Sequence, residues 1–385
     1  MNVILFDSNR SNFYPLSYTR PISEFRIGIL TIKEKWAHYY KNISTKTADY
    51  LVSKYPIMKQ KENLWINASV LPSKELKTEL DSLRNGEALE SNGKIIAFKN
   101  LNYSFKNLNK INTSILVNSI ENIWDIFSYN RREIEADFKL LTNSRKSQNI
   151  CGTNTVIGKY IFVEKGAKIS CSILNAENGP IYIGKNAEIM EGAIIRGPFA
   201  MGENAILKMG AKIYGSTTLG PHCKVGGEVN NSVFFGYSSK AHDGFLGNSI
   251  IGEWCNLGAD TNNSNLKNNY DEVKLWNYEM ERFKKTGLQF CGLIMGDHSK
   301  CGINTMFNTG TVIGVSANIF GSGFPRNFVP SFTWGGASGF QVYKLPKVFE
   351  VVSKVFKRRN LEFDKNEQNI LSEVYDMTKR YRNEQ

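Results

Sequence analysis

The stretch IYIGKNAEIMEGAIIRGPFAMGENAILKMGAKIYGSTTLGPHCKV, residues 181–225, decides the fold, because its apolar residues recur at every sixth position. These positions are Ile183, Ile189, Ile195, Met201, Leu207, Ile213, Leu219 and Val225. Two further series with the same spacing are Ile157, Val163, Ile169 and Met295, Cys301, Phe307, Ile313, Ile319. Glycine often follows the apolar residue, as at Gly184, Gly202 and Gly220.

A period of six fits neither an α-helix nor a plain β-strand, which repeat about every 3.6 and every 2 residues. It requires a unit of one short strand and one tight turn, and three such units close a triangular coil with its aliphatic residues inside. Stacked coils then bury a continuous core. An antiparallel sandwich is the alternative, but it does not keep phase over so many consecutive steps. The spacing therefore predicts a parallel β-helix built of hexapeptides.

The repeat breaks between about residues 262 and 290, which have no six-residue phase. A long loop that leaves a regular solenoid is typical of a functional element. After Phe320, a segment rich in Gly, Pro and aromatic residues is expected to cap the last coil, because the open end of a solenoid must be covered. Apolar residues at helical spacing from Leu345 to Phe356 then predict one or two terminal helices.

Residues 1 to about 145 lack the repeat and alternate between short apolar runs and helical patterns. NVILF (2–6) and NLWIN (63–67) are expected to form strands, and residues 28–40 and 134–142 to form helices. SKELKTELDSLRNG (73–86) has a serine cap before the helical pattern and a glycine after it. The alternation predicts an α/β domain.

Composition excludes several function classes. The net charge is +12, but the basic residues are spread along the chain, so phosphate-bearing small molecules explain the charge better than nucleic acid does. No run approaches the roughly 18 apolar residues of a membrane span, and the N-terminus lacks the features of a signal peptide. Six scattered cysteines form no CxxC pair. This usage indicates reduced thiols and a cytoplasmic protein without a zinc site.

The run AHDGFLGNSIIGEWCNLGADT, residues 241–261, resembles the acetyltransferase domain of the bifunctional bacterial enzyme that makes UDP-N-acetylglucosamine. The matching positions are His242, Phe245, Gly247, Ile251, Gly252, Asn256, Leu257, Gly258, Ala259, Thr261 and Asn265. Residues 294–314 match the coil that follows in that family. The whole chain resembles a shorter variant, labelled a sugar nucleotidyltransferase with a hexapeptide-repeat domain. The resemblance implies a left-handed β-helix, a homotrimer, and acetyl-CoA as the acyl donor.

The resemblance also implies roles for single residues. His242 would be the general base that takes a proton as an amine attacks the thioester, which suits an imidazole near neutral pH. Asn265 would orient His242 or hold the acceptor side, while Phe245 and Asn256 would contact the substrate. The plainer interpretations are a histidine packed on the solenoid and asparagines that only form turns.

Three positions depart from the family pattern. Asn230 stands where the family has a phosphate-binding lysine. Lys212 stands where the family has an arginine, and a lysine is a weaker bidentate clamp for a phosphate than an arginine is. Asp260 replaces a glycine, and its carboxylate disfavours a phosphate nearby. These departures leave the acceptor sugar open. Arg196, Lys208, Lys240 and Lys267 are alternative phosphate contacts.

The N-terminal part carries no G-x-G-T-R loop. Arg20, Arg26 and Lys35 are candidate ligands for a nucleotide triphosphate. Nucleotidyl transfer would also need Mg²⁺ held by carboxylates. The comparable strand ends in Asn67, so Asp7 and Asp125 are the possible substitutes.

The expected domains are a nucleotidyltransferase-like α/β domain over 1–147, whole or degenerate, a β-helix over 148–325 with the insertion 262–290, and a capping segment with helices over 326–385. The expected function is acetyl-CoA-dependent N-acetylation of an amino-sugar phosphate, nucleotidyl transfer to a sugar 1-phosphate, or both, in envelope-precursor synthesis. One alternative is nucleotidyl transfer alone, with the β-helix as a trimerisation scaffold. Another is a non-catalytic binding or assembly protein.

Overall fold

The structure, a computed structural model, describes residues 1–382, and the chain forms two compact units. The first unit comprises residues 1–13, 19–25 and 30–123. The second begins at residue 124 and also includes the short segments 14–18 and 26–29. Two pieces of the N-terminal sequence are therefore packed with the second unit.

The first unit is built on a mixed six-stranded sheet, called sheet A, with the order β2-β1-β3-β5-β4-β6. Strand β1 lies between two parallel neighbours, and β5 runs antiparallel to β3 and β4. The strands are β1 (Asn2–Phe6), β2 (Asn42–Lys46), β3 (Asn63–Asn67), β4 (Glu87–Ser91), β5 (Lys94–Lys99) and β6 (Asn109–Asn112). The two strands predicted from the sequence are confirmed as β1 and β3, and both are almost wholly buried.

Two α-helices of the first unit begin at side-chain caps. Ser73 accepts a hydrogen bond from the backbone N–H of Leu76 (3.1 Å) at the start of α2 (Lys74–Ser82), as the sequence predicted. Helix α1 (Ile32–Ala37) begins at Thr31 and is shorter than the helix predicted over 28–40. The reason is that Gly28 has a left-handed backbone (φ +77°) and belongs to the other unit. The 3₁₀ segments are η1 (Arg10–Phe13), η3 (Ile22–Glu24) and η4 (Asp49–Leu51).

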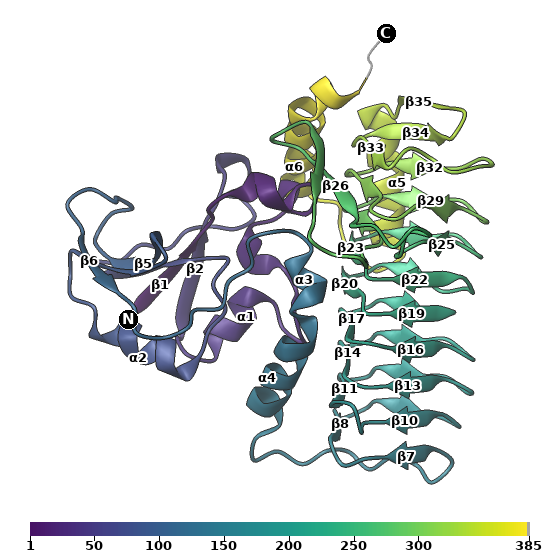
Figure 1. Cartoon of the computed structure of the whole chain (residues 1–385), viewed down its shortest axis with the longest axis horizontal. Helices are drawn as coiled ribbons and strands as arrows, with labels where there is room; N and C mark the ends of the chain where they lie inside the picture. Colours follow the sequence, from purple (N-terminus) through teal and green to yellow (C-terminus); the bar gives the residue numbers. More distant parts are fainter. Residues whose placement is uncertain (383–385) are drawn as a thin grey trace. The chain divides into compact units, whose positions relative to one another are not determined.

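The second unit is a parallel β-helix whose coils stack from β7 to β35 (Figure 1). Its three walls are called sheets B, C and D. Sheet B contains β7 (Thr155–Ile157), β10 (Ile173–Asn175), β13 (Ile194–Arg196), β16 (Lys212–Tyr214), β19 (Glu228–Asn230) and β22 (Phe245–Gly247). Sheet C contains β8 (Ile161–Val163), β11 (Ile181–Ile183), β14 (Phe199–Met201), β17 (Thr217–Leu219), β20 (Val233–Gly236), β23 (Ile250–Glu253), β28 (Ile294–Met295), β31 (Val312–Ile313) and β33 (Phe328–Val329). Sheet D contains β9 (Lys168–Ile169), β12 (Glu188–Ile189), β15 (Ile206–Leu207), β18 (Lys224–Val225), β21 (Ser239–Lys240), β24 (Asn256–Leu257), β29 (Lys300–Cys301), β32 (Asn318–Ile319), β34 (Thr333–Gly336) and β35 (Gly339–Val342).

The core of this unit consists of the residues that the six-residue period placed inside. All eight residues of the long series and all five of the third series are buried in one hydrophobic cluster. The prediction that Ile157 faces the core is wrong. Ile157 is 36 % exposed, and its neighbour Val156 is the residue that pairs with the inward-facing Leu174. The fold class expected from the sequence is otherwise confirmed: an α/β N-terminal region, a parallel β-helix and C-terminal helices.

Two hairpins accompany the coils near the C-terminal end of the solenoid. Strand β25 (Asn262–Asn263) pairs with β30 (Met306–Phe307), and the insertion between them contains an antiparallel hairpin of β26 (Lys274–Asn277) and β27 (Arg282–Lys285). Strands β34 and β35 form a second hairpin, and Phe340 in it packs partly against the core cluster, as a cap does.

The helices of the second unit pack on the solenoid. Helix α4 (Asn130–Thr142) follows the short α3 (Asp125–Ser128), and Asn130 donates from Nδ2 to the carbonyl of Ser216 beside β17 (2.6 Å). Helix α5 (Leu345–Lys357) buries Val348, Val352 and Phe356, and the Phe356 ring stacks on Trp254 at 4.2 Å. Helix α6 (Lys365–Met377) and η5 (Lys379–Tyr381) complete the part of the chain that is described.

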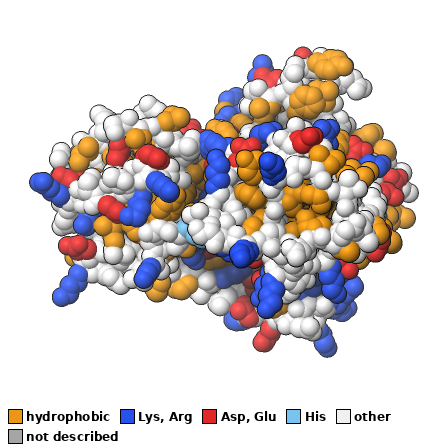
Figure 2. All heavy atoms as spheres, turned by 90° about the horizontal axis from the view of Figure 1, so that it is seen from below, with side chains coloured by type: hydrophobic (Ala, Val, Ile, Leu, Met, Phe, Trp, Pro, Cys, Tyr) orange, Lys and Arg blue, Asp and Glu red, His pale blue; other side chains and the backbone are white. Residues whose placement is uncertain are grey.

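The surface agrees with the dispersed charge of the sequence. Figure 2 shows lysine and arginine side chains scattered among acidic ones on the visible face. Among the helices within residues 1–382, none combines the length and the apolar character that a membrane span requires.

Candidate active site

His242 lies in the turn of residues 241–244, which joins β21 of sheet D to β22 of sheet B. Lys240 pairs with Val225 of the preceding coil, and Phe245 pairs with Glu228. The turn therefore has two residues more than the pair Gly226 and Gly227 in the coil before it. His242 is exposed, and its imidazole has no hydrogen-bond partner within the described residues.

Lys240 fixes this turn from inside the solenoid. Its side chain is 0 % exposed and occupies an inward position next to Leu257 of the following coil. Its Nζ donates to the carbonyls of His242 (2.9 Å) and Gly226 (3.3 Å). As a surface phosphate contact Lys240 is wrong, because its charge points into the core. Burial lowers the pKa of the Lys240 ammonium to about 8, although Asp243 and Asp260 raise it.

This buried ammonium predicts an unusual dependence of stability on pH. Because the pKa in the folded protein lies below the ordinary lysine value of 10.5, the unfolded chain binds more protons between about pH 8 and pH 10.5. The free energy of unfolding should therefore rise with pH between about 8 and 10.5, and Lys240 should contribute about 3 kcal/mol to that rise. We expect Lys240→Met to remove this contribution, measured by urea denaturation across that pH range.

The comparison of wild type with the variant cancels the titration of the other groups. Lys185→Met is the matched control, because the Lys185 side chain is 63 % exposed on the same solenoid. It should keep the wild-type slope. A Lys240→Met protein with the wild-type slope would show that the ammonium is not buried.

Two asparagine side chains join the coil of His242 to the next coil. Asn262 Oδ1 accepts from the N–H of Phe245 (2.7 Å), and Asn263 Oδ1 accepts from the N–H of Gly247 (2.9 Å). Asn263 is 4 % exposed and also donates to the carbonyl of Gly247 (3.1 Å). These side chains replace the backbone ladder between β22 and β25. They satisfy backbone groups that would otherwise be unpaired in the interior.

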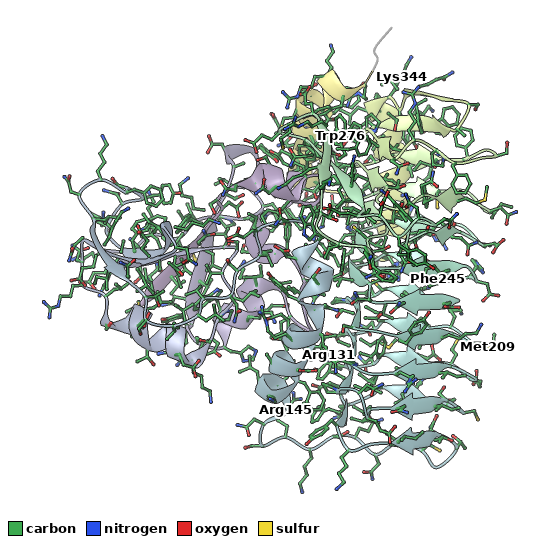
Figure 3. The ribbon with its side chains drawn as sticks, viewed as in Figure 1. Arg131, Arg145, Met209, Phe245, Trp276 and Lys344 are labelled. Atoms are coloured by element: carbon green, nitrogen blue, oxygen red, sulfur yellow. The ribbon has the colours of Figure 1, made fainter. Side chains whose placement is uncertain are left out.

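Phe245 and Asn265 meet across Gly247. A Cβ on Gly247 would lie 2.6 Å from both the Phe245 ring and the Asn265 amide nitrogen, so a larger residue there would displace these two side chains. Asn265 donates from Nδ2 to Asn248 Oδ1 (2.8 Å). Figure 3 shows Phe245 on the side of the coils that faces away from α4. This side of sheet B is open to a ligand or a partner.

Within one chain, His242 and Asn265 lie at opposite ends of β22. Asn265 contacts Asn248, which is three residues beyond Phe245 and therefore about 10 Å further along extended chain. His242 precedes the strand at its other end. Asn265 does not orient His242 within the same chain.

The remaining predicted substrate contacts are spread over two sheets. Lys212 is exposed on β16, two strands from Phe245 along sheet B, about 10 Å away. Asn230 pairs with Gly247 on the same sheet. Asn256 is exposed on sheet D. Asp260 is exposed one coil above Asp243, whose carbonyl accepts from the N–H of Asp260 (3.0 Å).

The three cationic residues expected to bind a triphosphate lie inside the protein. Arg20 and Lys35 are 5 % and 1 % exposed in the first unit. Arg26 is 8 % exposed and belongs to the second unit, where its Nε donates to the carbonyl of Phe235 (3.2 Å) and its Nη1 to that of Ile29. Each charge is directed into the fold.

The carboxylates do not form a magnesium site. Asp7 accepts from Arg10 Nη1 (2.5 Å), Thr47 Oγ1 (2.6 Å) and the N–H of Ile22 (2.9 Å), so its oxygens are used by the fold. Asp125 belongs to the other unit. Within residues 1–382, no three His, Cys, Asp or Glu side chains are grouped so as to hold a metal.

Sequence reasoning missed a small cavity of about 70 Å³ at the carboxyl ends of β1 and β3. Ser8, Asn67 and Ser69 line it, and Asn67 Oδ1 accepts from both hydroxyls (3.0 and 2.9 Å). In open sheets with parallel strands, ligands bind at the carboxyl ends where neighbouring connections diverge. The polar residues after β1, DSN at 7–9, were the available signal.

The fold defines the class of protein: a parallel β-helix protein with an α/β region at its N-terminus. Residues 3–146 match the sugar nucleotidyl transferase family model, which covers less than half of the chain. No curated protein matches the chain.

Several solved structures are similar at a low level. The polySia-specific acetyltransferase NeuO is 15 % identical, with 50 % of this chain and 87 % of that chain covered and a TM-score of 0.26. The UDP-N-acetylglucosamine acyltransferase of Arabidopsis is 16 % identical, with 61 % and 82 % covered and a TM-score of 0.26. AntD, an N-acyltransferase from Bacillus cereus in complex with dTDP and 3-hydroxybutyryl-CoA, is 15 % identical, with 53 % and 91 % covered and a TM-score of 0.23. A likeness of this extent does not determine what this chain binds.

Proposed function

We propose that the chain is a cytoplasmic transferase of sugar-nucleotide synthesis, whose β-helix transfers the acetyl group of acetyl-CoA to the amine of an amino-sugar phosphate. The observation that carries the proposal is the exposed His242 on an enlarged turn that Lys240 holds from inside. The donor and the general-base role come from the resemblance of residues 241–261 to the acetyltransferase pattern.

In this mechanism His242 takes the proton of the attacking amine as the amine adds to the thioester carbonyl. The carbon–sulfur bond then breaks, and the CoA thiolate leaves and takes up that proton. A general base contributes typically 100-fold to 10,000-fold to such a rate. Lys240 does not touch the substrate. It is a positioning residue, because its ammonium binds the carbonyl of His242 and so fixes the backbone from which the imidazole projects.

A homotrimer would complete the site. His242 and Asn265 lie at opposite ends of β22, so a second copy packed beside sheet B could bring its Asn265 to the first copy's His242. Acetyl-CoA would then lie between neighbouring prisms, and the insertion 262–290 would close over it. The β-helix domain would extend over 148–325 and the capping segment with its helices over 326–385.

Nucleotidyl transfer by the domain of residues 1–147 is the second candidate function. The family-model match over 3–146 and the cavity at the carboxyl ends of β1 and β3 favour it. The buried positions of Arg20 and Lys35, and the absence of a carboxylate cluster within residues 1–382, oppose it.

The test is CoA release from acetyl-CoA against a panel of amino-sugar phosphates, beside pyrophosphate release from nucleoside triphosphates with sugar 1-phosphates. CoA release with one sugar supports the first function. Pyrophosphate release alone supports the second, with the β-helix as a scaffold. Neither activity, with binding retained, would favour a non-catalytic binding protein.

A further inference from the structure

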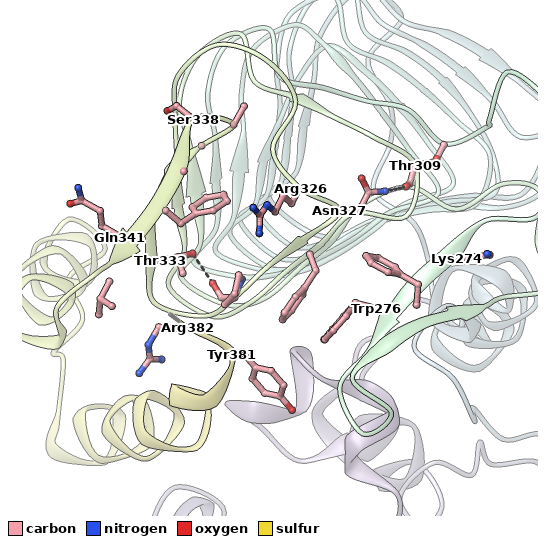
Figure 4. Close-up of a pocket in the computed structure, with 18 of the residues that line it drawn as sticks. Lys274, Trp276, Thr309, Arg326, Asn327, Thr333, Ser338, Gln341, Tyr381 and Arg382 are labelled. Carbon is pink, nitrogen blue, oxygen red and sulfur yellow. Dashed lines mark hydrogen bonds between the residues drawn. The ribbon is translucent and has the colours of Figure 1, made fainter. Parts of the chain in front are cut away.

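The second unit contains a pocket of about 940 Å³ that is formed partly by the insertion of residues 262–290 (Figure 4). The hairpin β26–β27, the cap with strands β33 to β35, and the C-terminal η5 form its walls. Pockets of about 300–1,000 Å³ are typical of small-molecule sites. Apart from Lys267, the lining lies outside the turn of His242 and the asparagine ladder.

The pocket is electrostatically positive. Its lining includes Lys267, Lys274, Arg326 and Arg382, and no Asp or Glu is among the described residues that line it. Arg326 and Lys274 are exposed and form no ion pair within residues 1–382. Two acids in and beside the hairpin form ion pairs: Glu272 with Lys285 (3.5 Å) and Glu281 with Arg380 (3.5 Å). Such a site attracts an anion, and an arginine suits a phosphate in particular.

One wall of the pocket is aromatic. The Trp276 ring stacks on Phe328 at 4.3 Å, and Phe283 meets Trp276 edge-on at 5.4 Å. The indole N–H of Trp276 is buried and has no hydrogen-bond partner in the described chain. A buried donor of this kind is normally satisfied, so an acceptor group is missing here.

The opposite wall is a glycine-rich hairpin tip. Residues 336–339, GASG, connect β34 to β35 and line the pocket. A Cβ on Gly339 would have no atom within 4 Å, so the space beside it is open. The side chains of Ser338 and Arg326 belong to this side of the pocket, and Trp276 to the other (Figure 4). A ligand can approach the backbone of the tip closely, as phosphates do at glycine-rich turns.

We propose that this pocket binds a nucleoside phosphate group, with the phosphate on Arg326 and the base on the wall of Trp276 and Phe328. Two ligands carry this chemistry: coenzyme A, through its phosphorylated adenosine, and a nucleotide sugar, through its nucleoside diphosphate. The assignment does not depend on His242 being a catalytic base, because it concerns binding by a different set of residues.

Isothermal titration calorimetry of the full chain tests the proposal, with CoA, 3′-phosphoadenosine 5′-phosphate, UDP and dTDP as titrants. We expect at least one titrant to bind, and Arg326→Ala to weaken that binding at least about tenfold, as loss of a charge-assisted contact does. Trp276→Leu should also weaken it. Arg358→Ala, which removes an exposed arginine outside the pocket, is the control and should bind as wild type does.

The pattern of titrants identifies the source of the ligand. Binding of CoA and 3′-phosphoadenosine 5′-phosphate alone assigns the pocket to the acyl donor, and binding of UDP or dTDP alone assigns it to a nucleotide sugar. The proposal is overturned if no titrant binds at millimolar concentration, or if Arg326→Ala binds as tightly as wild type. Failure of acetyl transfer with Arg326-dependent binding retained would reject the proposed function and keep this site.

Discussion

His242→Ala is expected to lower the rate of CoA release at least about 100-fold, which corresponds to about 3 kcal/mol of lost transition-state stabilisation. The reason is that the amine must lose a proton as it attacks, and His242 is the exposed base at the turn of residues 241–244. The thermal midpoint should not change, because the imidazole has no hydrogen-bond partner within the described chain whose loss would matter. The measurement is CoA release with the sugar found active for the wild type.

His38→Ala is the matched control, because it removes an exposed imidazole from the first unit. It should keep the wild-type rate and the wild-type thermal midpoint. A His242→Ala enzyme that works within about threefold of the wild type would contradict the assignment, since a missing general base costs far more than this. The base would then have to be sought on another residue.

Gly220→Ala is expected to destabilise the β-helix by about 4 kcal/mol or more, or to prevent its folding. A Cβ on Gly220 would lie 1.9 Å from the carbonyl oxygen of Phe235 and 2.4 Å from its carbon. Both atoms are backbone of the next coil, so that no side-chain rotation can relieve the clash. Urea denaturation followed by circular dichroism would measure the loss.

Gly302→Ala provides the comparison at an equivalent place, since Gly302 also follows an inward residue of the core, Cys301. Its Cβ would meet the Phe320 Cβ at 3.5 Å, an ordinary contact. We expect a change within about 1 kcal/mol. Equal losses in the two variants would mean that glycine is needed for backbone freedom at this position and not for the close approach of the coils.

The regular part of the fold could be predicted because the coils of the long series are uniform. As long as each coil consists of three steps of six residues, every sixth residue points inward. All eight residues of the long series are buried. The Ser73 cap and the buried face of α5 could also be predicted, because each depends only on residues close to one another in the sequence.

The site could be predicted only in part, because the coils change length where it lies. Leu219 pairs with Phe234 in sheet C and Val225 with Lys240 in sheet D, so this coil is 15 residues long on both walls. In sheet D, Ser239 pairs with Asn256, so the coil that follows has 17 residues. Steps of six residues from Val225 therefore do not identify Lys240 as an inward-facing residue. From the sequence alone, Lys240 was expected on the surface.

By itself the sequence determined the stacked coils, their interior over the long series, the place of the insertion and the presence of His242 in its motif. Only the tertiary structure decided that Lys240 is buried beneath His242, that asparagine side chains join β22 to β25, and that Asn265 lies at the far end of the strand. It also formed the pocket of Trp276 and Arg326 from segments 50 residues apart in the sequence. The physical reason is that a period reports local geometry, whereas the direction of a polar side chain depends on which unpaired backbone groups the neighbouring coil brings to it.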